Sequence, residues 1–229
     1  MHNYFKIFNM TKLTQEQIQA NKTEFINLIR STGREGIENL INWLENKSDF
    51  FIAPASTVFH GNYAGGLCQH SLNVYKAMKK FIVNSDMLAL KEQELDKIPE
   101  ASIIISTLLH DICKANFYFP EIKNFKDEAT NTWKKYQTYK CEDHFPVGHG
   151  EKSVIMLQNF IKLTASEIIS IRWHMGMFDP GMMLSPYEKP AYQKAVDESP
   201  LTVLLQISDF YASHMMEYMI DQKVENIVY

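Results

Sequence analysis

Apolar residues recur at helical spacing over most of the chain, beginning near its start. Thr14 is followed three residues later by Gln17, a capping-box pattern that opens a segment we expect to be helical to about residue 30. A second amphipathic segment follows at 37–44, after two glycines that interrupt the first. Together the two segments predict an N-terminal helical extension at about residues 14–46.

The same periodicity predicts a series of further helices. They lie at about residues 67–83, 99–114, 146–163, 164–174 and 200–224, and Thr164 with Glu167 forms a second capping box. Residues 53–66 and 181–190 are rich in glycine and proline, which predicts loops. No flexible linker divides the chain, so we expect a single domain over 1–229, with a core at about 55–218.

Residues 117–145 interrupt the helical pattern with aromatic and polar residues. Polar and apolar positions alternate over 132–139, and a turn-like stretch, Asp-Glu-Ala-Thr-Asn, precedes them. We interpret this segment as an inserted loop or short β-hairpin. The predicted fold class is therefore all-α, a compact helical bundle with one short insertion.

Composition and charge narrow the choice of compartment and partners. The chain has 229 residues, of which 45% are hydrophobic and 22% charged, and a formal net charge of -4. Non-specific nucleic-acid binding depends on Lys and Arg, so this charge argues against it. Cys68, Cys113 and Cys141 form no CxxC pair, which favours a reducing compartment. Since no long apolar stretch and no signal peptide is visible, we expect a cytoplasmic protein that binds no membrane.

Histidines and aspartates in apolar surroundings are the candidates for chemistry. A buried aspartate is costly unless it is paired or binds a metal, and imidazole with carboxylate suits divalent transition metals. The residues in question lie within or at the start of predicted apolar helices: His70, His110, Asp111, His149, His174 and Asp209. They come from separate helices, so only tertiary packing would bring them together, as in metal sites of helical bundles.

Less specific interpretations remain open for several of these residues. His70 and His174 could be core histidines bonded to backbone carbonyls, and His144 competes with His149 as a ligand. Asp179 and Asp197 compete with Asp209, but their polar surroundings allow them to be solvated.

The order of these residues resembles the HD superfamily of metal-dependent phosphohydrolases. The resemblance rests on Gly65–Leu72, on His110-Asp111-Ile112-Cys113-Lys114, on Gly148-His149-Gly150-Glu151 and on Arg172–Gly176. It covers roughly residues 55 to 218 and is closest to the HD domain of bacterial 3′–5′ oligonucleotide-trimming exoribonucleases.

The resemblance implies a role for each residue. His70, His110, Asp111 and Asp209 would hold one divalent ion, and Asp111 would bridge to a second ion held by His149 and His174; Mn, Fe, Co and Zn are the candidate metals. Asp111 and Lys114 are the catalytic candidates, and Lys114 would also contact a phosphoryl oxygen or, alternatively, only complement the helix dipole. Arg172 is a weaker candidate for the same contact. Apart from the resemblance, the aromatic residues of the insertion, Trp133, Tyr136 and Tyr139, are candidates to stack a base or, as we favour slightly, to pack the insertion onto the core.

The implied activity is hydrolysis of a phosphomonoester or phosphodiester of a nucleotide or short oligonucleotide through a metal-bound hydroxide. Cys113 stands where the family has glycine, and the exoribonucleases' nucleic-acid-binding domain is missing, so we expect a small phosphorylated substrate instead of long RNA. Two alternatives remain: a di-iron HD-type oxygenase, and a non-enzymatic module that binds nucleotides through the metal.

Overall fold

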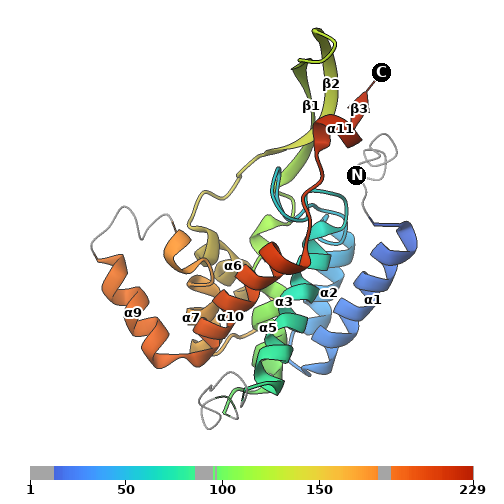
Figure 1. The fold of residues 1–229 in the computed structure, drawn as a ribbon. Helices are drawn as coiled ribbons and strands as arrows, with labels where there is room; N and C mark the ends of the chain where they lie inside the picture. Colours follow the sequence, from blue (N-terminus) through green and yellow to red (C-terminus); the bar gives the residue numbers. More distant parts are fainter. Residues whose placement is uncertain (1–12, 86–94, 96, 180–186, 229) are drawn as a thin grey trace.

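Apart from a short helix near the C-terminus, the described helices form one body, and a β-hairpin projects from it (Figure 1). The computed structural model describes residues 13–85, 95, 97–179 and 187–228. The helices within these residues are α1 (Gln15–Ser31), α2 (Ile37–Asn46), α3 (Gly66–Val83), α5 (Glu100–Leu109), α6 (His149–Gln158), α7 (Ala165–Arg172), α9 (Glu188–Glu198), α10 (Pro200–Tyr211) and α11 (Gln222–Glu225). Two 3-10 turns, η2 (Ile112–Lys114) and η3 (Gly176–Phe178), and a π-helical turn, η4 (Ala212–Met216), complete them.

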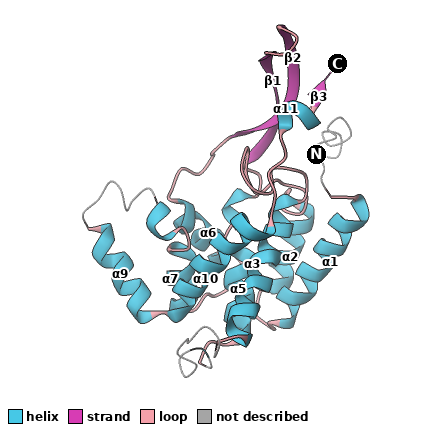
Figure 2. Ribbon diagram, viewed as in Figure 1, coloured by secondary structure: helices cyan, strands magenta, loops and turns pink. Residues whose placement is uncertain are grey.

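The prediction of an all-α fold is wrong, because the protein is mixed α/β (Figure 2). Strands β1 (Tyr118–Asp127), β2 (Thr132–Cys141) and β3 (Ile227–Val228) form an antiparallel sheet in the order β1-β2-β3. The hairpin turn contains Asn131 at a φ of 53°, a left-handed conformation that asparagine tolerates. Alternation over 132–139 indicated a hairpin locally, but nothing near β2 in sequence indicated its pairing with β3.

Both capping boxes are confirmed. Thr14 accepts a hydrogen bond from the backbone N–H of Gln17, whose side chain accepts one from the backbone of Thr14. Thr164 and Glu167 make the same reciprocal pair at the start of α7. Each box satisfies amides that would otherwise have no partner at the start of the helix, which is why these boundaries follow from local sequence.

Three predicted segments differ from the structure. The helix expected over 99–114 ends at Leu109, and the chain turns through His110 and Asp111 into η2. The helix expected over 200–224 ends at Tyr211 and is followed by η4 and extended backbone. Part of the loop expected over 181–190 belongs to α9; residues 180–186 lie outside the described part of the chain.

Helix α3 lies at the centre of the body, packed against α1, α5 and α10 (Figure 1). Its apolar side chains belong to two core clusters, one shared with α1, α2, α5 and α6 and another shared with α10. Helix α7 packs against both α6 and α10. Within the described residues, no helix combines the length and apolar character needed to cross a membrane.

Residues 217–228, which we call the C-terminal strap, connect the helical body to the hairpin. The backbone N–H of Gly61 donates to the carbonyl of Tyr218 at 2.9 Å, and Asn62 exchanges two hydrogen bonds with the backbone of Ile220. Further on, Gln222 accepts from the Thr138 hydroxyl of β2 at 2.6 Å. The strap therefore fixes both the loop before α3 and the base of the sheet.

Candidate metal centre

The six predicted ligand residues lie together, although they come from separate elements. Four of them are buried residues with exposed fractions of 2% or less: His70 of α3, His110 after α5, Asp111 before η2, and His174 just beyond α7. Asp209 of α10 and His149, the first residue of α6, are partly accessible, with 17% and 29% of their side chains exposed. The break after Leu109 matters here, since it turns His110 and Asp111 toward the same centre.

The Asp111 carboxylate lies between two pairs of histidines. Its Oδ1 atom is 2.8 Å from His149 Nε2 and 3.6 Å from His174 Nε2. Its Oδ2 atom is 3.4 Å from His110 Nε2 and 3.6 Å from His70 Nε2. Each oxygen therefore faces a different pair, which is the arrangement a bridging carboxylate needs.

Hydrogen bonds at Nδ1 set the tautomers of the buried histidines. The Nδ1 atoms of His110 and His174 lie 2.9 Å and 2.7 Å from the backbone carbonyls of Thr107 and Ile171. A carbonyl only accepts, so Nδ1 carries the proton and Nε2 presents a lone pair to the centre.

The Nε2 atoms of His70, His110 and His174 are buried without a hydrogen-bond partner. Buried polar atoms are normally satisfied, and unpartnered imidazole nitrogens facing carboxylate oxygens are what a cation would complete. Triads with ligand atoms within 4.8 Å of one another include His70–His110–Asp111, Asp111–His149–His174 and His110–His174–Asp209. These buried groups could hold metal ions, and the nitrogen and oxygen donors suit a divalent transition metal.

The pKa shifts of Asp111, Asp209 and His70 show that the centre favours positive charge: the pKa values of the two carboxylates are lowered, and that of the imidazole is raised. Burial alone would raise the pKa of Asp111, but Lys114 and His110 outweigh it and hold that pKa well below its ordinary value. Burial also opposes the shift at Asp209, whose pKa is lowered by His70. At His70, burial lowers the pKa, but Glu217 and Asp209 outweigh it and raise the pKa to about 10. A bound cation would take the place of these protons.

His149 differs from the other ligand candidates. Burial lowers the pKa of its imidazole in spite of the opposing hydrogen bond to Asp111, so the neutral form is favoured. Its Nδ1 atom lies 3.3 Å from Cys113 Sγ. Burial raises the pKa of that thiol to about 12, so it stays protonated near neutral pH. His144, the alternative ligand, has 76% of its side chain exposed and lies outside the cluster.

Lys114 lies at the edge of the cluster, with 14% of its side chain exposed. Its Nζ atom is 2.7 Å from Asp111 Oδ2. Burial alone would lower the pKa of this ammonium, but Asp111 raises it, so the group remains charged. The sequence predicted one continuous helix that carries both His110 and Lys114. In the structure, Lys114 belongs to η2 instead and reaches Asp111 from there.

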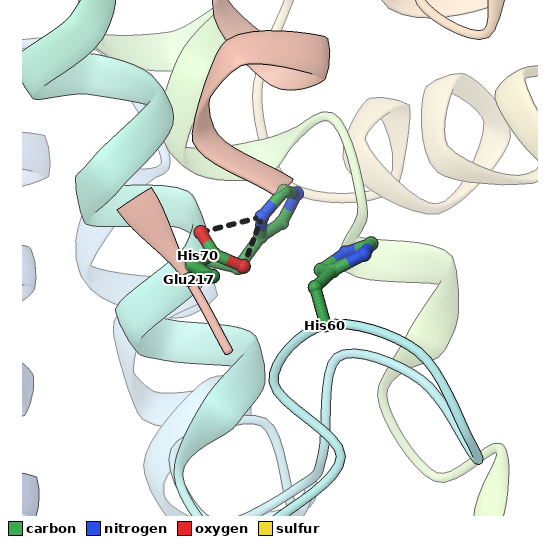
Figure 3. Close-up of side chains that lie close together, drawn as sticks. All are labelled: His60, His70 and Glu217. Atoms are coloured by element: carbon green, nitrogen blue, oxygen red, sulfur yellow. Dashed lines mark hydrogen bonds and ion pairs between the residues drawn. The ribbon is translucent and has the colours of Figure 1, made fainter. Parts of the chain in front are cut away.

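Sequence reasoning missed Glu217. Its side chain is 1% exposed, and its Oε1 atom accepts from His70 Nδ1 at 3.0 Å (Figure 3). This bond fixes the tautomer of His70 just as backbone carbonyls fix those of His110 and His174. A helix through 200–224 would have carried Glu217 past Asp209, whereas the turn η4 ends the helix and returns the chain over α3.

His60 also lies beside the cluster. Its ring centroid is 4.8 Å from that of His70, and its Nε2 atom is buried without a partner (Figure 3). Burial lowers its pKa to about 4, so the imidazole is neutral near pH 7. The only sequence signal was its place in the loop before the first ligand helix.

The other predicted substrate contacts have partners elsewhere. Arg172 forms ion pairs with Glu151, Asp179 and Glu188, and its guanidinium stacks 3.9 Å from the centroid of Trp173. Trp133 is 73% exposed near the turn of the hairpin, opposite Lys126. Tyr136 packs against Phe125 farther along the same hairpin. The structure does not bring Trp133 or Tyr136 to the cluster, since the hairpin projects away from the helical body (Figure 1).

Comparison with known proteins adds no relative to this description. No family model matches the chain, no curated protein matches it, and no solved structure matches it.

Proposed function

We propose that this chain is a metal-dependent phosphohydrolase that cleaves a phosphomonoester or phosphodiester of a nucleotide or short oligonucleotide. One observation carries the proposal: the two oxygens of Asp111 face two different pairs of histidines. A carboxylate so placed suits two cations at once. The six ligand candidates are also more than a single structural tetrahedral site needs. The resemblance of the ligand order to the HD superfamily points in the same direction.

His70, His110, Asp111 and Asp209 would hold one ion, and Asp111, His149 and His174 the other. When bound, two such ions would clamp a phosphoryl group and lower the pKa of a water at the site toward neutrality. Glu217 and the carbonyls of Thr107 and Ile171 hold the imidazoles in the tautomer that binds metal. His149 and Asp209, the least buried ligands, mark the side from which substrate enters.

Lys114 is the residue of this chain that we assign to the reacting phosphate. Its ammonium stays charged beside Asp111 and reaches solvent with part of its side chain. A fixed cation at the edge of the centre can stabilise negative charge that develops on phosphoryl oxygens during hydrolysis. It is held by Asp111 before substrate arrives, so little reorganisation is required.

The proposal predicts both metal content and hydrolysis. Protein purified without chelator should contain close to two transition-metal ions per chain, measured by elemental analysis. It should release product from a panel of nucleoside phosphates, cyclic dinucleotides and short oligonucleotides assayed with Mn, Fe, Co and Zn. Asp111→Ala should abolish turnover, since both ions lose a ligand, whereas Asp197→Ala, on the exposed face of α9, should not.

Lys114→Ala separates chemistry from metal binding. It should keep the metal content of the wild type and lose on the order of a hundredfold in kcat. Protein that takes up no metal on reconstitution would contradict the metal centre. Protein that holds iron, hydrolyses nothing and consumes oxygen with an organic substrate would contradict hydrolysis and favour an oxygenase instead.

A further inference from the structure

A cavity of about 220 Å³ lies beside the candidate metal centre and has no role so far. Its walls come from η2, from the base of the hairpin and from α6. The lining residues are Cys113, Lys114, Phe117, Tyr118, Asp143, Val147, His149 and Lys152. Since Lys114 and His149 belong both to this wall and to the cluster around Asp111, a molecule bound at the centre would extend directly into the cavity.

Lys152 is an unusual residue for such a wall. It follows His149 by one turn of α6, and only 8% of its side chain is exposed. Lysine is almost never buried unless it is paired. Its Nζ atom lies 2.5 Å from Oδ1 of Asp143 and 5.4 Å from the centroid of the Phe117 ring. The carboxylate partner has 37% of its side chain exposed, so its charge is partly hydrated.

The charges that line the cavity are two ammonium groups against one carboxylate. Lys114 faces Asp111, and Lys152 faces Asp143. The Asp111 carboxylate lies behind the wall and is shared among histidines. Two ammonium groups therefore line the cavity next to the place proposed for the reacting phosphate.

We propose that this cavity binds a second, non-reacting phosphoryl group of the substrate, with Lys152 as the residue that selects it. The inference rests on the proposed function for the identity of the neighbouring reacting group. On binding, the phosphoryl oxygens replace the Asp143 carboxylate as the partner of Lys152, and Asp143 becomes fully hydrated. Lysine binds phosphate as a point charge, so the exchange requires no reorientation of α6.

The volume of the cavity limits what it holds. Drug-sized ligands occupy pockets of about 300–1,000 Å³. A cavity of about 220 Å³ is smaller than this range and suits a single phosphoryl group better than a whole nucleotide. Among the substrates considered above, this favours compounds with two neighbouring phosphoryl groups over an oligonucleotide threaded through the pocket.

Substrates with one and with two phosphoryl groups test the proposal, assayed on the metal-loaded protein. For a nucleoside diphosphate, Lys152→Met should raise KM on the order of tenfold and leave kcat within a few-fold, because one charged contact is lost. For the corresponding monophosphate, KM should hardly change. Lys162→Met, at an exposed lysine beyond α6, is the matched control and should behave like the wild type.

Asp143→Asn gives the opposite sign and keeps the test independent of folding defects at Lys152. An asparagine retains the oxygen that accepts from the backbone N–H of Phe145, but it removes the competing negative charge. The diphosphate should then bind more tightly and KM should fall. A purely structural ion pair between Lys152 and Asp143 would give no gain in affinity, so an unchanged or raised KM in this variant would overturn the proposal.

Calorimetric titration with inorganic pyrophosphate separates failure of the pocket from failure of the proposed function. Any affinity that the metal ions supply is common to all variants, so only the differences between variants matter. Weaker binding in Lys152→Met and tighter binding in Asp143→Asn support the anion site even if no phosphate ester is hydrolysed. If hydrolysis is found but pyrophosphate binds all variants equally, the pocket proposal is wrong and the proposed function stands.

Discussion

At the scale of single residues, the hydrogen bonds at Nδ1 orient the imidazoles of three buried histidines toward the centre: His70, His110 and His174. Backbone carbonyls serve His110 and His174, because both histidines lie just past a helix and bond back to its last turn. His70 lies inside α3, where carbonyls are already used by the helix, and so requires a side chain. Glu217 supplies it from a distant part of the chain.

Glu217 should therefore control metal affinity. Glu217→Ala removes the acceptor of the His70 Nδ1 proton, and loss of such an outer partner typically lowers metal affinity about 10–100-fold. Glu217→Gln keeps a carbonyl oxygen that accepts from Nδ1, so affinity should be largely restored. Competition with a chromogenic chelator measures both effects.

Glu225→Ala serves as the control for that measurement, since it removes an exposed glutamate from the same C-terminal strap. Wild-type metal affinity in Glu217→Ala would show that the bond to His70 has no part in binding.

Six candidate ligands could be picked from the sequence because charged or polar residues in apolar helices are rare. Glu217 could not, since its neighbours gave no sign that the helix from Pro200 would end at Tyr211. Apolar and aromatic residues continue beyond that point, so the helical pattern continues too. The turn η4 packs against α3, an element far away in the sequence, and the local pattern does not show that contact.

At the scale of elements, the contact between α6 and α7 sets the distance between His149 and His174. Gly150 makes this contact possible: a Cβ atom there would lie 2.2 Å from the carbonyl oxygen of Arg172. Both ligand candidates are next to this contact in sequence, so the two helices cannot separate without moving their imidazoles apart.

Gly150→Ala should destabilise the protein despite the helix propensity of alanine. At an exposed position inside a helix, alanine is more favourable than glycine by about 1 kcal/mol. Overpacking against a fixed backbone typically costs about 1–3 kcal/mol, so the net free energy of unfolding should fall. Denaturant unfolding measures the change, and metal affinity should fall with it.

Gln158→Ala, at the exposed end of the same helix, gains propensity without a new contact and provides the comparison. A Gly150→Ala protein that is more stable than the wild type would show that α6 can move away from α7 at no cost.

Element boundaries differed in how far the sequence could predict them. Thr14 and Thr164 start helices through bonds made within three residues, so α1 and α7 begin where the capping boxes predict. The end of α5 depends on His110 and Asp111 turning toward partners on other elements. Pairing of Lys135 and Tyr136 with β3 joins residues far apart in the chain and has no local signature.

At the scale of the whole molecule, an ion pair joins the N-terminal helices to α7. Arg34 donates to both oxygens of Glu167 at 2.7 and 3.0 Å and to the carbonyl of Lys162. The Glu167 side chain is fully buried and also accepts from Ser102 at 2.7 Å. Arg34 thus connects the turn before α2 with α7 and with the segment between α6 and α7. The candidate ligands His149 and His174 lie in α6 and just beyond α7.

This pair makes stability depend on pH. Burial alone would raise the pKa of Glu167, but Arg34 outweighs it and lowers the pKa below the ordinary 4.5. Stability from this group is therefore present above pH 4.5 and is lost as pH falls through the lowered value. Glu167→Gln should cost about 3–5 kcal/mol near pH 7, because Arg34 loses its partner, and the cost should shrink in acid.

Thermal unfolding between pH 3 and pH 7 measures this difference. Glu38→Gln breaks an exposed pair with Arg30 and should change stability little at any of these pH values. Equal effects of the two substitutions would mean that burial adds nothing to the Arg34–Glu167 pair.

The C-terminal strap also decides which parts of the chain an engineer can alter independently. The hairpin resembles an appended module in outline (Figure 1), yet Thr138 of β2 bonds Gln222, and the same strap carries Glu217 to His70. Deleting the hairpin would remove one of the strap's two anchors, leave only the bonds to Gly61 and Asn62, and loosen a residue at the centre. The exposed turn of the hairpin at residues 128–131 lies outside the paired strands and away from the bond to Gln222. A reporter peptide or affinity tag belongs there, and a deletion does not.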